Sequence, residues 1–176
     1  IFSLVSRDIF FSSANFTSMA YQIPEIAILS IAVMLSMLTG GIDLSIVAIS
    51  NAAALVAAWI MTTKMGESET LSYSWIIIAC VVGTLVGLAA GAVNSIIIAR
   101  LDVTPILATL ATGTLFNGIA IGITDGVSVS GLPENFMRVG NGTFLGIPTP
   151  FVLMVVIALA VGYFINRTTL GLKVFL

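Results

Sequence analysis

Long apolar runs alternate along this chain with short polar segments. About 20 residues of helix are needed to cross a bilayer, and the first run reaches that length only if its helix begins near Thr17 or Ser18. The pattern predicts an all-α, polytopic membrane protein with about five membrane-crossing helices. The five runs are Ile26–Leu38, Leu44–Met61, Leu71–Ala99, Pro105–Ile123 and Phe151–Ile165.

A polar stretch, Thr39–Ser45, separates the first two runs. Its Gly40-Gly41 pair can end one helix, and Asp43 or Ser45 can cap the next. Inside a membrane, such a break is tolerated only where protein shields the backbone or where the backbone lines a water-filled path. We therefore expect a broken helix at Gly40-Gly41, with a transport pathway as the leading interpretation. The alternative for Asp43 is a helix cap that does not contact a solute.

Glycines recur at every fourth position of the third run, at Gly83, Gly87 and Gly91. This spacing is typical of helices that pack closely through small residues. Asn94 is almost in line with them, and it either shares this packing or lines a path.

The fourth run carries Thr109, Thr112 and Asn117 on one face together with Gly113 and Phe116, because these residues follow one another at spacings of three and four. This face is polar enough to point towards the inside of the protein. The two threonines and Asn117, together with Asp43 and Ser45, make up the predicted substrate pathway.

Composition narrows the function. Hydrophobic residues make up 59% of the 176 and charged residues 8%, whereas a soluble domain carries about a quarter charged residues. With no histidine and only Cys80, the chain has no intrachain disulfide, no histidine- or cysteine-based metal site and no Ser-His-Asp triad. We therefore expect no catalytic residues, no metal and no cofactor, and the lack of a basic patch argues against nucleic acid.

Positive charges suggest the orientation of the chain. Arg100, Arg167 and Lys173 lie within a few residues of predicted helix ends on one side, where the positive-inside bias acts. We expect that side to be cytoplasmic. The long polar segment Thr124–Pro150 then lies in the periplasm, and its length suggests a functional role.

The residues L-T-G-G-I-D-L-S, from Leu38 to Ser45, resemble the ribose-type (simple sugar) permease subunits of bacterial ABC importers. One departure is Ile46-Val47-Ala48, where the family usually has a glycine-containing turn. Further similar blocks follow in the family's order at Thr104–Ala120, Ser130–Phe136, Leu145–Pro150 and Thr168–Phe175.

The resemblance implies a type II ABC importer-like permease of the bacterial inner membrane. It implies a second permease subunit, cytoplasmic ABC ATPase subunits and a periplasmic solute-binding protein as partners, and transport of a small sugar or related hydroxylated solute into the cytoplasm. This chain has no G-x-x-x-x-G-K-S/T motif, so ATP hydrolysis is expected in a separate partner subunit. Family members are longer, so residues 1–176 are expected to be one transmembrane permease domain, incomplete at both ends and lacking the C-terminal half.

In this arrangement Glu134 and Arg138 are the natural residues to dock the binding protein, although an ion pair between the two is an alternative role. Two other transport functions stay open. An ion-gradient-driven secondary transporter can also use a broken helix and a buried carboxylate, and an ABC permease for branched-chain amino acids is related in architecture. A membrane scaffold without transport activity would explain the glycine spacing but not the polar break.

Overall fold

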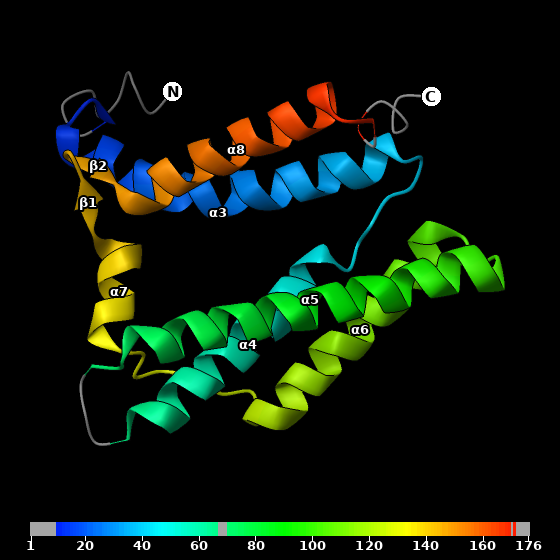
Figure 1. The fold of residues 1–176 in the computed structure, drawn as a ribbon, viewed down its shortest axis with the longest axis horizontal. Helices are drawn as coiled ribbons and strands as arrows, with labels where there is room; N and C mark the ends of the chain where they lie inside the picture. The colour runs from blue at the N-terminus through cyan, green and yellow to red at the C-terminus, as the bar shows by residue number, and fades with distance from the viewer. Residues whose placement is uncertain (1–9, 67–69, 170, 172–176) are drawn as a thin grey trace. The chain divides into compact units, whose positions relative to one another are not determined.

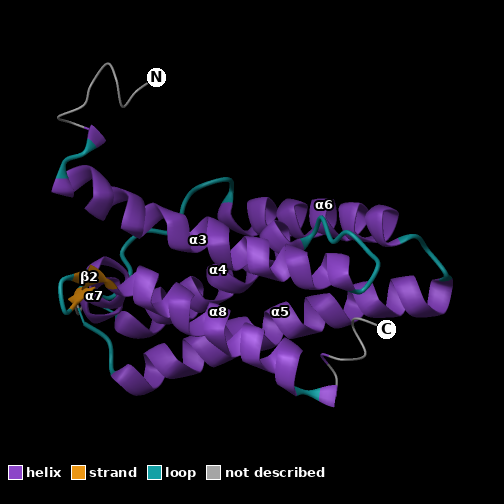
Figure 2. Ribbon diagram, turned by 90° about the horizontal axis from the view of Figure 1, so that it is seen from above, coloured by secondary structure: helices purple, strands orange, loops and turns teal. Residues whose placement is uncertain are grey.

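The computed structural model describes residues 10–66, 70–169 and 171. Five helices in this part of the chain are long and apolar enough to cross a membrane, which confirms the predicted all-α class and number of spans (Figure 1). A short helix, α7 (Glu134–Asn141), and a two-stranded hairpin, β1 (Thr143–Phe144) and β2 (Ile147–Pro148), lie between the last two spans (Figure 2). The spans are α3 (Ser13–Leu38), α4 (Ile46–Met65), α5 (Tyr73–Leu101), α6 (Pro105–Thr124) and α8 (Thr149–Arg167).

The first span begins earlier than the sequence indicates. The Ser12 side-chain oxygen accepts a hydrogen bond from the Asn15 N–H at 3.2 Å, so Ser12 acts as the cap and α3 starts at Ser13. Pro24 therefore lies in the helix interior, where it is buried, and not in the early turns, where a start near Thr17 or Ser18 would place it.

The chain divides into two compact units, one formed by Ile1–Ala32 with Arg138–Leu176 and the other by Val33–Met137. Each is described here by itself. That residues 1–176 form one transmembrane domain stays a prediction.

In the first unit, the hairpin leads directly into α8. Its strands pair Thr143 with Pro148 and Phe144 with Ile147, around a turn in which Leu145 and Gly146 both have positive φ (52° and 81°). Two successive positive φ values give the turn a twist that matches that of the strands. The Thr149 N–H donates to the Gly142 carbonyl at 3.0 Å and closes the hairpin at the start of the helix.

The second unit is built on α4 and α5, which pack closely at Gly83. A Cβ added to Gly83 would lie 2.8 Å from the Ala53 carbonyl oxygen and 3.2 Å from the Ala57 Cβ. At Gly87 the nearest atom would be 3.9 Å away, and at Gly91 no atom lies within 4 Å. The close approach is therefore concentrated at Gly83. The structure does not support a packing role for Gly91 within this unit.

A small apolar core lies where α4 ends and α5 begins. Met61, Leu71 and Ala79 are buried there, and Phe136 packs against them. The Asn135 carboxamide accepts from the Leu71 N–H at 3.3 Å and donates to the Leu71 carbonyl at 2.5 Å. The segment after α6 thus returns to cover the α4–α5 loop.

The glycine contacts predict a difference between two matched substitutions. Gly83→Ala places a methyl group against a backbone carbonyl, and overpacking of this kind costs about 1–3 kcal/mol. Gly91→Ala meets nothing and gains up to about 1 kcal/mol of helix propensity. We expect a lower melting temperature in detergent for Gly83→Ala only. Equal melting temperatures for the two variants would contradict the close packing at Gly83.

Candidate functional site

The predicted break is present between Leu38, the last residue of α3, and Ile46, the first residue of α4. Gly40 has φ of +87°, a conformation that glycine adopts at no steric cost. The Ser36 hydroxyl donates to the Gly41 carbonyl at 3.0 Å and closes the end of α3. The broken helix at Gly40-Gly41 is thus confirmed.

Asp43 organises the backbone just before α4. Its Oδ1 accepts hydrogen bonds from the Ser45 N–H at 2.8 Å and from the Ser45 hydroxyl at 2.6 Å. This is an Asx turn, in which an aspartate accepts from the backbone two residues ahead. Ser45 is the N-cap residue of α4, and its side chain makes no capping bond to the helix. Asp43 therefore satisfies the N–H of the cap residue rather than one inside the first turn.

Helix α5 holds this turn through Asn94. The Asn94 Nδ2 donates to the Ser45 hydroxyl at 2.7 Å, so hydrogen bonds run from Asn94 through Ser45 to Asp43. Ser45 is completely buried and Asn94 is 4% exposed. The Asn94 Oδ1 is buried too and has no hydrogen-bond partner among the described residues. Asn94 thus links α5 to the break.

Helix α6 packs against the other side of the break. The Thr109 hydroxyl accepts from the Leu44 N–H at 3.1 Å and donates to a carbonyl of its own helix at 2.8 Å. A Cβ added to Gly113 would lie 3.3 Å from the Ser45 Cα, so α6 comes close to the backbone of the break. Gly113 is on the polar face of this run, but nothing in the sequence indicates that it permits this approach.

The break lies about one to two helical turns in from the ends of α5 and α6 that pack beside it. Asn94 precedes the end of α5 by about two helical turns, or about 10 Å, and Thr109 follows the start of α6 by about one turn. The polar groups of the break are thus surrounded by membrane-spanning helices. Because nearby side chains satisfy them, the interruption is compatible with the membrane interior.

The predicted pathway residues fall into two groups. Ser45, Thr109 and Thr112 are 0, 1 and 5% exposed, and their hydroxyls hydrogen-bond within the chain. Asp43 is half-buried and borders a groove, and Asn117 is exposed and borders a separate cavity.

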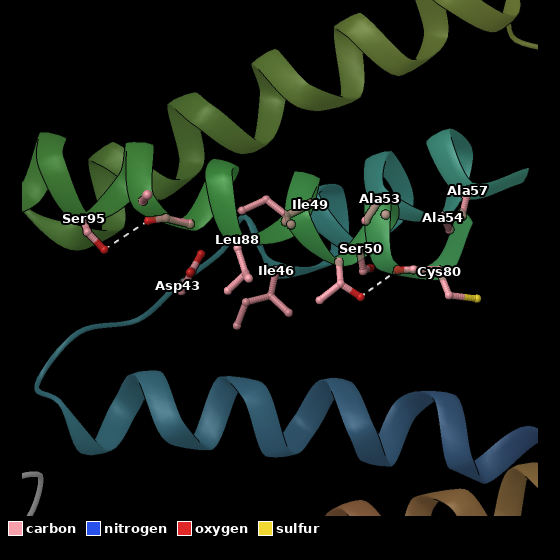
Figure 3. Close-up of a pocket in the computed structure, with 15 residues that line it drawn as sticks. Asp43, Ile46, Ile49, Ser50, Ala53, Ala54, Ala57, Cys80, Leu88 and Ser95 are labelled. Carbon is pink, nitrogen blue, oxygen red and sulfur yellow. Dashed lines mark hydrogen bonds between the residues drawn. The ribbon is translucent and has the colours of Figure 1, made fainter. Parts of the chain in front are cut away.

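The groove beside Asp43 runs between α4 and α5 and encloses about 990 Å³. Small side chains line most of it, including Ser50, Ala53 and Gly91. Figure 3 shows Asp43 at one end of the groove and Ala57 at the other. The groove is thus mostly apolar, with a carboxylate at one end.

The proposed docking residues lie on α7. Glu134 is in its first turn and Arg138 in its last, and both are exposed. Their role in docking stays a prediction.

Lys173, one of the three basic residues expected on the cytoplasmic side, lies outside the described residues.

The Asx turn predicts that Asp43→Asn and Asp43→Leu differ. Asparagine keeps the side-chain oxygen that accepts from Ser45, whereas leucine removes it. We expect the melting temperature of Asp43→Asn to remain near the wild-type value, and Asp43→Leu to lose about 1 kcal/mol or more of stability. If both variants fold normally but lose uptake equally, the charge of Asp43 has a separate role.

Comparison with known proteins identifies the family. The family model described as "Branched-chain amino acid transport system / permease component" matches residues 15–176. The D-allose transport system permease protein of Escherichia coli (strain K12) is 29% identical over 99% of this chain and 51% of its own length. The ribose import permease protein of Bacillus subtilis (strain 168) is 32% identical over 94% of this chain and 49% of its own length.

A third relative is the autoinducer 2 import system permease protein of Photorhabdus luminescens, which is 28% identical over 97% of this chain and 46% of its own length. The chain spans about half the length of these curated relatives. No solved structure matches it significantly. These matches confirm the resemblance to ribose-type permeases, and with the five apolar spans they indicate a multi-pass inner-membrane protein. The chain belongs to the branched-chain amino acid transport system / permease component family.

Proposed function

We propose that this chain is part of the permease subunit of an ATP-driven ABC importer, which moves a small sugar or related hydroxylated solute from the periplasm to the cytoplasm. The observation that carries the proposal is the polar break, held among three apolar helices and bordered by a groove. The names of the relatives favour a sugar-like solute, since two of them transport allose and ribose. The family title mentions branched-chain amino acids, so a test must include one.

The predicted pathway residues have two roles in this proposal. Asp43 and Asn117 border cavities and contact the solute. Ser45 and Thr109 are buried, and they support the pathway by fixing the backbone just before α4. Thr112 is also buried and hydrogen-bonds to its own helix. Contacts to the solute are few and weak, which allows it to leave as readily as it enters.

The remaining subunits follow from the importer class. ATP hydrolysis takes place in separate cytoplasmic ABC ATPase subunits, a second permease subunit completes the pore, and a periplasmic solute-binding protein delivers the solute. Arg100 and Arg167 end α5 and α8 on the cytoplasmic side. The segment that carries α7 then faces the periplasm, where Glu134 and Arg138 meet the binding protein.

Uptake in proteoliposomes tests the proposal. The complete permease that contains this sequence is reconstituted with its ATPase and binding protein, and uptake of labelled D-ribose, D-allose and L-leucine is measured. We expect uptake of a sugar that requires ATP and the binding protein. Uptake that follows a sodium or proton gradient without ATP would replace this proposal with a secondary transporter, and uptake of L-leucine alone would change the solute class.

Charge reversal on α7 tests the docking surface. Glu134→Lys or Arg138→Glu is expected to reduce stimulation of the ATPase by the binding protein severalfold and to leave basal ATPase activity unchanged, because charges at the rim of an interface mainly affect encounter and register. Asp125→Asn, which removes a charge from the same segment outside α7, is the control. Cysteines at Ser130 and Asn141, in a Cys80→Ser background, should react with an impermeant reagent only from the periplasm. Reaction only from the cytoplasm would refute the orientation.

A further inference from the structure

Two adjacent cavities lie between α4 and α6, on the side of the break that leads towards the C-terminal ends of both helices. The helices meet where Gly113 approaches Ser45 and diverge from there (Figure 1). The cavities enclose about 440 and 510 Å³ and share Leu55, Thr124 and the segment 127–129. They therefore lie next to each other, and we call the two together the α4–α6 cleft.

The smaller cavity contains two carboxamides, those of Asn51 from α4 and Asn117 from α6. Each of the five membrane-spanning helices carries one asparagine. Asn15, Asn94 and Asn166 donate hydrogen bonds through their side chains. Asn51 and Asn117 make no side-chain hydrogen bond within the described residues, and both line the same cavity.

An unpaired carboxamide has a high cost in lipid. Moving an amide into hydrocarbon without a hydrogen-bond partner costs about 2–7 kcal/mol, depending on the reference state. Polar side chains in membrane spans accordingly face the protein interior or a water-filled cavity. Ala54, Ala58 and Ala120 line the same cavity, and their small side chains leave room for water or a solute beside the two amides.

The chemistry of the cleft selects for a neutral, hydroxylated ligand. Each carboxamide offers one acceptor oxygen and two donor hydrogens, which match the donor and acceptor capacity of hydroxyl groups. No charged side chain lines either cavity, so neither the carboxylate nor the ammonium group of an amino acid would find a charged partner there. In the larger cavity, Trp59 adds an aromatic surface for the apolar face of a sugar ring.

We propose that Asn51 and Asn117 form a solute-contacting pair in the periplasmic half of the pathway, and that the polar break lies at the inner end of this half. This inference rests on the proposed function and deepens it, because it names the site and the ligand chemistry. Asn51 lies about 9 Å along α4 from Ser45, and Asn117 about 6 Å along α6 from Gly113. A solute released from the pair would thus meet Asp43 and its neighbours next.

Thiol labelling tests whether the cleft contains water. In the complete protein with Cys80→Ser, Asn51→Cys and Asn117→Cys are treated from the periplasmic side with a small, cationic, membrane-impermeant thiol reagent. Both are expected to react. Leu115→Cys, an exposed apolar position on α6 that lines neither cavity, is the matched control and should not react. Failure of both asparagine positions to react would mean that lipid or another helix fills the cleft, and it would overturn the proposal.

Protection by solute tests the ligand class and does not depend on how transport is driven. D-ribose or D-allose at high concentration is expected to slow labelling at both positions, whereas L-leucine at the same concentration is not. Labelling that is equally fast with every solute would also overturn the proposal, even in a protein whose uptake is ATP-driven. Conversely, protection by a sugar in a protein whose uptake follows an ion gradient would keep this site and reject the ABC mechanism.

Uptake by alanine variants supplies a functional measure. Asn51→Ala and Asn117→Ala should each reduce the rate of sugar uptake about two- to tenfold, the effect of losing one or two hydrogen bonds. Membrane levels and stimulation of the ATPase by the binding protein should not change. Asn166→Ala removes a carboxamide that hydrogen-bonds to its own helix, and it should transport like the wild type. Wild-type uptake by both cleft variants would contradict a role in solute contact.

Discussion

The hydrogen bonds from Asn94 through Ser45 to Asp43 hold the polar turn between two membrane-spanning helices, α3 and α4, against α5. Hydrocarbon offers no partner to a free N–H or C=O group, so each one at the break needs a partner from the protein. Asp43 supplies one from within the turn, Thr109 supplies another from α6, and Asn94 attaches the turn to α5. Without these bonds, the apolar packing of α4, α5 and α6 would enclose unsatisfied backbone.

The other polar side chains of this unit fall into two groups, according to whether they form hydrogen bonds within the protein. Hydroxyls near the break return to carbonyls of their own helices, as Thr112 does to Ala108. The carboxamides of Asn51 and Asn117 border a cleft and have no hydrogen-bond partner among the described residues. The buried hydroxyls are thus satisfied within the unit, whereas the two carboxamides are open to water or to a solute.

The apolar pattern was sufficient to predict the five spans and the position of the break, because a run of about 20 apolar residues has few alternatives in a membrane. It could not show how the spans face one another. Gly83, Gly87 and Gly91 look equivalent in the sequence, yet the contact distances to α4 increase from Gly83 to Gly91. Thr109 and Asn117 likewise share a helical face, but the former packs on the break and the latter borders the cleft.

For the same reason, the sequence pattern did not predict that Asn51 and Asn117 lie together. They belong to different helices, and the relative position of these helices decides that both line one cavity. The cap at Ser12 was missed because an alternative start near Thr17 had equally good polar residues. Local chemistry thus predicted where elements begin and end to within a few residues. Tertiary contacts decided which polar residues were free to interact with a ligand.

The break also has an electrostatic consequence. Helices α4 and α6 begin beside it, at Ile46 and Pro105, and α3 ends beside it at Leu38, while α5 ends at Leu101, just before α6, so positive and negative ends of helix dipoles meet near the turn that holds Asp43. Because these dipoles oppose one another, the carboxylate of Asp43 depends on its hydrogen bonds to Ser45 rather than on the field of the helix ends.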